Sequence, residues 1–151
     1  MEKSGQTIAR AMQNALDSAN LIAEDIDYIN AHGCSLPNYD VSETNAIKIV
    51  FKDRAYRIPI SSIKSMIGQS LAPSSGFQMI SSCLTLRDDI LPPTINYDYP
   101  EPDCDLDYVP NTARHNRVQT VLMNSHSVGG THSAIIIGRY KDEYGGGNCE
   151  F

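Results

Sequence analysis

The 151-residue sequence contains no tryptophan, no long apolar run and little positive charge. Its 12 lysines and arginines stand against 18 aspartates and glutamates, which gives a net charge of −6. Nucleic-acid binders need a basic surface to offset phosphates, and anionic membranes attract basic segments. No stretch approaches the ~20 apolar residues that span a bilayer. We therefore expect a protein that binds neither nucleic acid nor membrane.

Cysteine is also scarce, and its four positions are far apart (Cys34, Cys83, Cys104 and Cys149). The sequence has no CxxC pair and no HExxH motif, so we expect no structural zinc site, no other metal centre and no cofactor. The first ten residues are polar and lack the apolar core of a signal peptide. From these features we expect a cytoplasmic protein with free thiols.

The pattern of apolar residues predicts helices that alternate with strands. The predicted elements, in order, are a helix at 4–20, a strand at 26–31, a helix introduced by Asp40 and Glu43 as a capping box, a strand at 57–63, a helix opened by residues 73–75, and strands at 118–123 and 133–140. Alternation of this kind indicates an α/β fold with a mixed sheet of four to five strands and helices packed on it.

Three further expectations concern the buried side of the third helix, the proline-rich stretch and the bounds of the domain. The third helix is expected to face the core through its apolar residues from Phe77 to Leu86, with Cys83 among them. Residues 92–117 are rich in proline and show no periodicity, and a loop of this length is usually functional or covers another surface. We place the domain at residues 1–140 and expect residues 141–151 to form a flexible tail, or else a disordered contact segment.

Three segments carry side chains that favour chemistry. His32 follows a strand directly, where ligands gather in α/β sheets, and it can act as acid, base or oxyanion donor or simply hydrogen-bond its own loop. Lys64 ends the next predicted strand and is either catalytic or a solvated surface lysine. In residues 124–132, Gly129 and Gly130 allow backbone amides to approach a ligand, although a plain hairpin turn also accounts for them.

Four blocks of the sequence share their spacing with a known family: residues 27–33, 42–48, 61–68 and 91–111. In these blocks the chain resembles the C-terminal half of β-ketoacyl-acyl-carrier-protein synthases, the elongating condensing enzymes of the thiolase superfamily. The resemblance extends over about residues 4–140 and implies half of a thiolase-like fold. Enzymes of this family transfer an acyl chain to a cysteine and condense it with a malonyl unit on an acyl carrier protein, with loss of carbon dioxide.

The resemblance implies roles for individual residues. His32 matches the first histidine of the family's Cys-His-His triad, Lys64 matches its lysine, and Glu43 matches a glutamate that can pair with that lysine. Gln69 stands where the family has its second histidine. An amide can donate a hydrogen bond, but it cannot carry a proton at neutral pH. If the contribution of that histidine is acid–base, its loss costs about two to four powers of ten in rate.

The family's glycine-rich turn, Asn-Ser-Phe-Gly-Phe-Gly-Gly, also differs here. His126 replaces a gating phenylalanine and Ser127 replaces a glycine, whereas Gly129 and Gly130 are kept. A backbone amide of this turn lines the oxyanion hole in the family. The geometry of that hole therefore depends on whether the replaced glycine needed a positive φ.

The nucleophilic cysteine of the family lies in an N-terminal half that this sequence does not contain. None of the four cysteines has its sequence context, and Cys34, in place of a threonine, is a substitute nucleophile only if a neighbouring base activates its thiol. We therefore expect a subunit of a fatty-acid or polyketide synthase that is incomplete by itself.

Several ways to complete or use such a subunit remain open. A ketosynthase N-terminal half or a full-length ketosynthase would supply the cysteine, or a second copy of this chain would stand in for the missing half through self-association. An acyl carrier protein binds the assembly. The alternative is a non-catalytic scaffold or carrier-protein-binding subunit. A third interpretation is an inactive remnant, or a lyase or cyclase that reuses His32.

Overall fold

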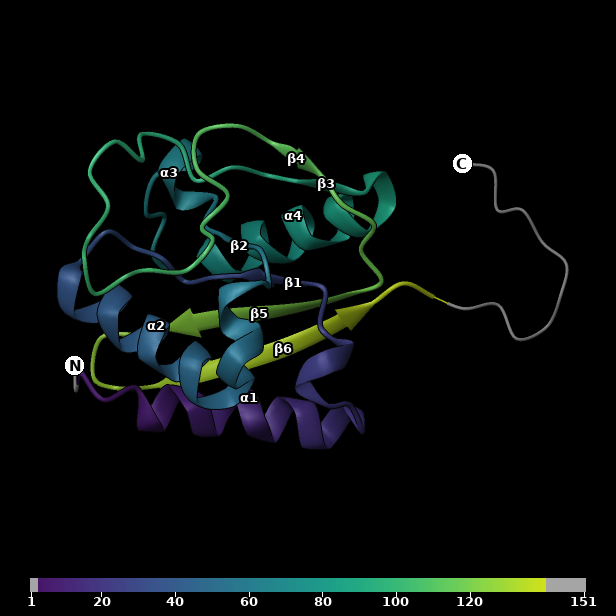
Figure 1. Cartoon of the computed structure of the whole chain (residues 1–151), viewed down its shortest axis with the longest axis horizontal. Helices are drawn as coiled ribbons and strands as arrows, with labels where there is room; N and C mark the ends of the chain where they lie inside the picture. Colours follow the sequence, from purple (N-terminus) through teal and green to yellow (C-terminus); the bar gives the residue numbers. More distant parts are fainter. Residues whose placement is uncertain (1–2, 141–151) are drawn as a thin grey trace, which may run out of the picture.

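The computed structural model describes residues 3–140, and a four-stranded mixed sheet lies at its centre (Figure 1). The strands are β1 (Tyr28–Asn30), β2 (Ile60–Ser61), β5 (Thr120–His126) and β6 (His132–Gly138), in the order β2-β1-β5-β6. β2 and β5 run parallel to β1, and β6 is antiparallel to β5. The prediction of a mixed sheet with packed helices is confirmed. The predicted tail, residues 141–151, lies outside the described residues.

Helices cover both faces of this sheet. The helices are α1 (Gln6–Ala19), α2 (Pro37–Phe51), α3 (Lys64–Ile67) and α4 (Ser74–Asp88), with short 3-10 turns η1 (Ala23–Asp25) and η2 (Lys52–Tyr56). Figure 1 shows α1 and α2 on one side, and α4 on the other beside the ribbon of β3 (Ile90–Leu91) and β4 (Arg114–His115). No helix of residues 3–140 is long and apolar enough to cross a membrane.

The apolar core lies mainly between α1, α2 and the sheet. Ile8, Met12 and Leu16 recur at four-residue intervals on α1, so they form one stripe along the helix. This stripe packs against Ile29 and Leu122, which are fully buried and face the same side of the sheet. Burial of the stripe positions β1 and β5 next to each other, and their carboxyl ends therefore meet at one edge.

Helix α4 packs on the sheet through its polar side, which contradicts the prediction. Its buried residues are Ser74, Gln78, Ser82, Thr85 and Leu86. Of the residues expected in the core, Leu86 is buried, but Phe77, Ile80 and Leu84 are 45%, 59% and 44% exposed, and Cys83 is exposed as well. The apolar pattern separated the two sides of the helix, but the polar side meets the sheet because Asn30 donates to Ser82 and Gln78 donates to the carbonyls of Ala31 and Asn124.

Other element boundaries differ from the prediction in ways that affect the site. Helix α2 begins with Pro37, ahead of Asp40 and Glu43, so these two carboxylates lie within the helix and form no capping box. Lys64 begins α3 and does not end a strand. His126 belongs to β5, so the turn of the hairpin consists of residues 127–131 alone.

We predict that Leu122→Ala lowers the free energy of unfolding by about 2–5 kcal/mol, because it removes a fully buried side chain from the core and leaves a cavity. Ile22→Ala is the matched control, since Ile22 is 61% exposed, and it should change stability by less than about 0.5 kcal/mol. Urea denaturation followed by circular dichroism measures both. Equal losses for the two variants would contradict the assignment of the core.

Candidate active site

The carboxyl ends of β1 and β5 gather three histidines at one edge of the sheet. His32 follows β1, which runs parallel to β5, and His126 is the last residue of β5. His132 begins β6 and is the direct cross-strand partner of His126. The ring centroids of His32 and His126 are 5.0 Å apart, as are those of His126 and His132. His132 was missed in the sequence, although its distance from the turn equals that of His126.

His32 is buried and held in one orientation. Its Nδ1 accepts a hydrogen bond of 3.2 Å from the backbone N–H of His126. Burial and the nearby Lys64 ammonium, together with the other two histidines, lower the pKa of His32 to about 4 against the opposing charge of Glu43. The imidazole is therefore neutral at pH 7, and its proton lies on Nε2. In this tautomer His32 offers a hydrogen-bond donor to a ligand.

Lys64 is buried at the start of α3, which excludes the interpretation as a solvated surface lysine. Its ammonium donates hydrogen bonds to the carbonyl of His32 at 2.6 Å and to Oε1 of Gln78 at 3.4 Å. Burial lowers the pKa of Lys64, while the charge of Glu43 opposes this effect. The lysine thus holds the backbone of His32 from one side.

Glu43 holds the same loop from the other side. Its two carboxylate oxygens accept hydrogen bonds from the backbone N–H groups of His32 at 2.9 Å and Gly33 at 3.0 Å, and Asn124 Nδ2 donates a third at 3.0 Å. Burial would raise the pKa of Glu43, but the adjacent imidazole of His126 and the two backbone amides lower it to about 2. No ion pair joins Glu43 to Lys64 within the described part of the chain; each contacts the His32 loop instead.

A network of amide side chains supports this edge and was not foreseen from the sequence. Gln78 Nε2 donates to the carbonyls of Ala31 at 2.9 Å and Asn124 at 3.1 Å. Asn30 Nδ2 donates to Ser82 Oγ at 3.0 Å. The signal was present, since Ser74, Gln78 and Ser82 recur every four positions along one side of α4. Their hydrogen bonds fix the rotation of α4 on the sheet.

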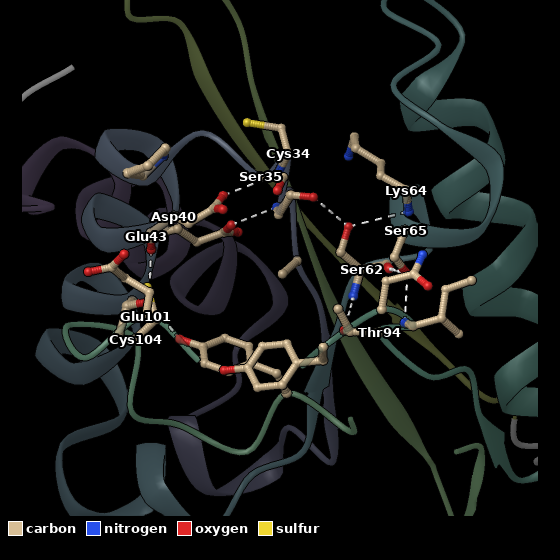
Figure 2. Close-up of a pocket in the computed structure, with 18 of the residues that line it drawn as sticks. Cys34, Ser35, Asp40, Glu43, Ser62, Lys64, Ser65, Thr94, Glu101 and Cys104 are labelled. Atoms are coloured by element: carbon tan, nitrogen blue, oxygen red, sulfur yellow. Dashed lines mark hydrogen bonds between the residues drawn. The ribbon is translucent and has the colours of Figure 1, made fainter. Parts of the chain in front are cut away.

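A cavity of about 460 Å³ opens beside the His32 loop (Figure 2). Cys34, Asp40, Lys64 and Gln69 contribute to its wall, and part of the proline-rich stretch, including Thr94 and Tyr108, closes it. Figure 2 shows Asp40 and Glu43 directed toward the loop that carries Cys34. The side chain of Gln69 accepts a hydrogen bond from Ser74 Oγ at 3.0 Å. Gln69 therefore shares one cavity with Lys64.

Cys34 lacks the surroundings of a nucleophile. Burial and the charge of Asp40 raise the pKa of its thiol, because both disfavour the thiolate. Burial and the neighbouring Glu43 also raise the pKa of Asp40, to about 6. The backbone N–H of Cys34 donates to Asp40 Oδ1 at 3.1 Å. The arrangement stabilises the loop and keeps the thiol protonated.

The glycine pair lies in the turn of the hairpin, between His126 and His132. Gly129 and Gly130 have φ values of 98° and 83°, in the region that glycine tolerates best, and a Cβ at either position would meet open space. Ser127 has no positive φ, so the replacement of the family's glycine causes no strain here. Its N–H donates to the carbonyl of Thr131 at 2.9 Å and closes the turn.

A comparison with protein families identifies the chain. Residues 1–98 match the model of the family described as beta-ketoacyl synthase, C-terminal domain. The match covers more than half of the chain. The chain therefore belongs to the β-ketoacyl synthase family, in its C-terminal domain.

Curated relatives agree with this assignment. The chain is 44% identical over 142 residues to the tetracenomycin polyketide synthase ketoacyl synthase alpha subunit of Streptomyces glaucescens, with 94% of this chain and 33% of the relative covered. It is 44% identical over 131 residues to 3-oxoacyl-(acyl-carrier-protein) synthase 2 of Coxiella burnetii, with 87% and 32% covered. The chain spans about a third of the length of these relatives.

Solved structures share the fold. A type II polyketide synthase complex, described as the acyl-carrier protein AntF with its ketosynthase AntDE bound to the hexaketide, matches with a TM-score of 0.91 and 38% identity over 93% of this chain and 35% of that chain. The ishigamide ketosynthase/chain length factor matches with a TM-score of 0.85 and 37% identity, over 89% and 33%. The predicted half of a thiolase-like fold is confirmed.

We predict that Glu43→Gln lowers the free energy of unfolding at pH 7 by about 3 kcal/mol, because an amide NH₂ would face backbone donors where a carboxylate now accepts. Glu24→Gln, at an exposed position, is the matched control and should change stability by less than about 0.5 kcal/mol. Urea denaturation at pH 7 compares the two variants.

The same pair of variants tests the ionisation of Glu43. Its pKa of about 2 lies below the ordinary value of 4.5, so its stabilising contribution is complete above pH 4.5 and is lost as the pH falls toward 2. The difference in stability between wild type and Glu43→Gln should therefore shrink over this window. A difference that stays constant from pH 7 to pH 3 would show that Glu43 is not an anionic acceptor.

Proposed function

We propose that the chain is the C-terminal part of a ketosynthase that acts as a subunit of a polyketide or fatty-acid synthase. Its reaction is the decarboxylative condensation of acyl thioesters held on an acyl carrier protein. The observation that carries this proposal is the joint placement of His32 and Lys64, buried at one strand end and connected by a hydrogen bond of 2.6 Å. These are the two residues that match the family's histidine and lysine.

His32 is the hydrogen-bond donor of the proposed site. Because its Nδ1 accepts the His126 N–H, its Nε2–H is free to bind a thioester carbonyl and to stabilise the oxyanion that forms from it. Lys64 and Glu43 act through the backbone of His32, from opposite sides, and keep the ring in place. Gln69 contributes a side-chain amide to the wall of the cavity, and Gly129 and Gly130 form part of the turn between β5 and β6.

We propose that a separate cysteine-bearing region completes the site. The exposed apolar residues of α4 support this step, since Phe77, Ile80 and Leu84 share one side of the helix. Met66, Ile67 and Leu71, in and after α3, are exposed as well. Exposed apolar clusters of this kind mark interfaces. In this proposal a ketosynthase N-terminal half or a full-length ketosynthase binds the exposed apolar surface of α3 and α4. Self-association of this chain is the competing outcome.

The acyl carrier protein is the second proposed partner. One structural relative is described as a complex of a ketosynthase with an acyl-carrier protein, and the family's substrates are carried in this form.

A non-catalytic role is the second candidate function. Gln69 favours it, because an amide at this position cannot move a proton. In this form the chain would bind the acyl carrier protein or complete a larger synthase as a scaffold. Binding of the carrier protein would then be independent of His32, whereas condensation would not occur.

We predict that Ile80→Asp abolishes the complex between this chain and a co-expressed cysteine-bearing ketosynthase region, because a charge would be buried in the apolar contact. Ile49→Asp is the control: Ile49 is 40% exposed on α2, on the opposite side of the sheet. Size-exclusion chromatography after co-purification detects the complex. If both variants bind as well as wild type, α4 is not the interface.

We predict that His32→Ala reduces the condensation rate of the assembled complex by about two to four powers of ten, because the oxyanion donor is lost. His115→Ala, at an exposed position of β4, should leave the rate unchanged. Product formation from acyl and malonyl carrier protein, followed by mass spectrometry, measures the effect. An unchanged rate for His32→Ala would refute the shared-site proposal, and carrier-protein binding without condensation would favour the scaffold.

A further inference from the structure

His126 and His132 form a close imidazole pair on adjacent strands. Their Nδ1 atoms are 3.2 Å apart, and the rings meet edge to face. Two imidazole nitrogens at this distance attract each other only when one of them carries a proton. The side chain of His126 is 1% exposed, whereas His132 is only half-buried. The pair therefore connects the protein surface with the interior.

The second ring nitrogen of His126 is buried without a hydrogen-bond partner in the part of the chain that the structure describes. Its Nε2 faces Glu43 Oε1 at 3.5 Å, which is an ion-pair contact but too loose for a hydrogen bond. Buried polar groups are almost always satisfied. The Nε2 of His126 is the inner end of the imidazole pair, and it lies beside the ring of His32 and toward the Glu43 carboxylate.

Titratable groups face the pair from α2 and from the end of β1. Glu43 faces it from α2 as a buried carboxylate, and His32 faces it from the end of β1 as a neutral ring with Lys64 behind it. The His32 ring is in turn approached by Tyr39 of α2, with centroids 6.5 Å apart. Burial and the charge of His126 lower the pKa of His132, so the outer ring releases its proton readily. No group of described residues is arranged to hold a metal ion here.

We propose that His132 and His126 form a proton relay that carries protons from solvent to the position beside His32, with Glu43 as the counter-ion of the inner ring. His132 takes a proton from water on Nε2 and passes the proton of its Nδ1 to His126 Nδ1. His126 then presents its Nε2–H inside the site. The relay rests on the proposed function for its chemical purpose, although the proton path itself can be measured separately.

The condensation needs one proton for each turnover. The malonyl thioester loses carbon dioxide, and the electron pair of the broken C–C bond forms the new bond to the acyl carbonyl. The C–S bond of the acylated cysteine breaks, and its electron pair stays on sulfur as a thiolate. That thiolate takes up the proton that His126 delivers, and His126 is reprotonated through His132. Gln69 cannot supply this proton, since an amide does not ionise.

The first test is a histidine titration by ¹⁵N NMR on the full chain, or on its complex with the cysteine-bearing region. Because one proton is shared between two rings, His126 and His132 should titrate as a coupled pair in two steps. His132→Gln should convert the curve of His126 into a single step, and the control His115→Gln, at an exposed position, should leave both curves unchanged. Curves of His126 that are identical in wild type and His132→Gln would overturn the relay.

The second test is the pH profile of condensation by the assembled complex. His132→Gln should reduce the rate at pH 7 by about ten- to a hundredfold and move the pH profile. Imidazole added to His132→Ala should restore part of the rate, because the half-buried position is open to a small base. If the role of His132 is merely structural, added imidazole will not restore the condensation rate of His132→Ala. Imidazole should also leave the rate of His115→Ala unchanged.

The two tests fail in distinguishable ways. If the wild-type complex does not condense acyl thioesters, the proposed function is wrong, and the titration alone decides whether the proton is shared. If the complex is active and His132→Gln retains the wild-type pH profile, the proposed function stands and the relay is refuted. His126→Phe, with the residue that the family has at this position, removes the inner ring and should change the pH profile in the same way as His132→Gln.

Discussion

The site depends on one carboxylate. Glu43 enters from α2 and accepts the backbone N–H groups of two consecutive residues, His32 and Gly33, at the point where β1 ends. A third donor, Asn124, comes from β5. The acceptor therefore joins a helix, the end of one strand and the neighbouring strand. Without it, the His32 loop would expose two donors to an apolar interior, and the orientation of the imidazole would not be defined.

The order of the longer helices and the sheet strands followed from the sequence, because their apolar residues recur with a regular period, whereas the short α3 and the β3–β4 ribbon were not predicted. The stripe of Ile8, Met12 and Leu16 indicated α1, and the Gly129–Gly130 pair indicated the final hairpin. Pairing across that hairpin was also accessible, since His126 and His132 flank a five-residue turn symmetrically. The resemblance to condensing enzymes added His32 and Lys64, which the structure brings into contact through the His32 carbonyl.

Other features depend on what lies opposite each residue, and a single sequence does not contain that information. The spacing of Asp40 and Glu43 fits a capping box, but Pro37 already begins α2, so both carboxylates are free to bind the loop. In α4 the two-sided pattern was evident. Which side meets the sheet is decided by the Asn30 amide and the backbone carbonyls of Ala31 and Asn124, which are hydrogen-bonded by the polar side of α4.

The polar contact of α4 has a consequence for association. Apolar packing tolerates small rotations of a helix, whereas Gln78 binds the carbonyls of two different strands and permits one rotational setting. The outward apolar side is therefore presented in a fixed geometry before anything covers it. Less conformational entropy remains to be lost on docking, so the same contact area yields tighter association. Hydrogen bonds beneath the helix pre-organise the surface above it.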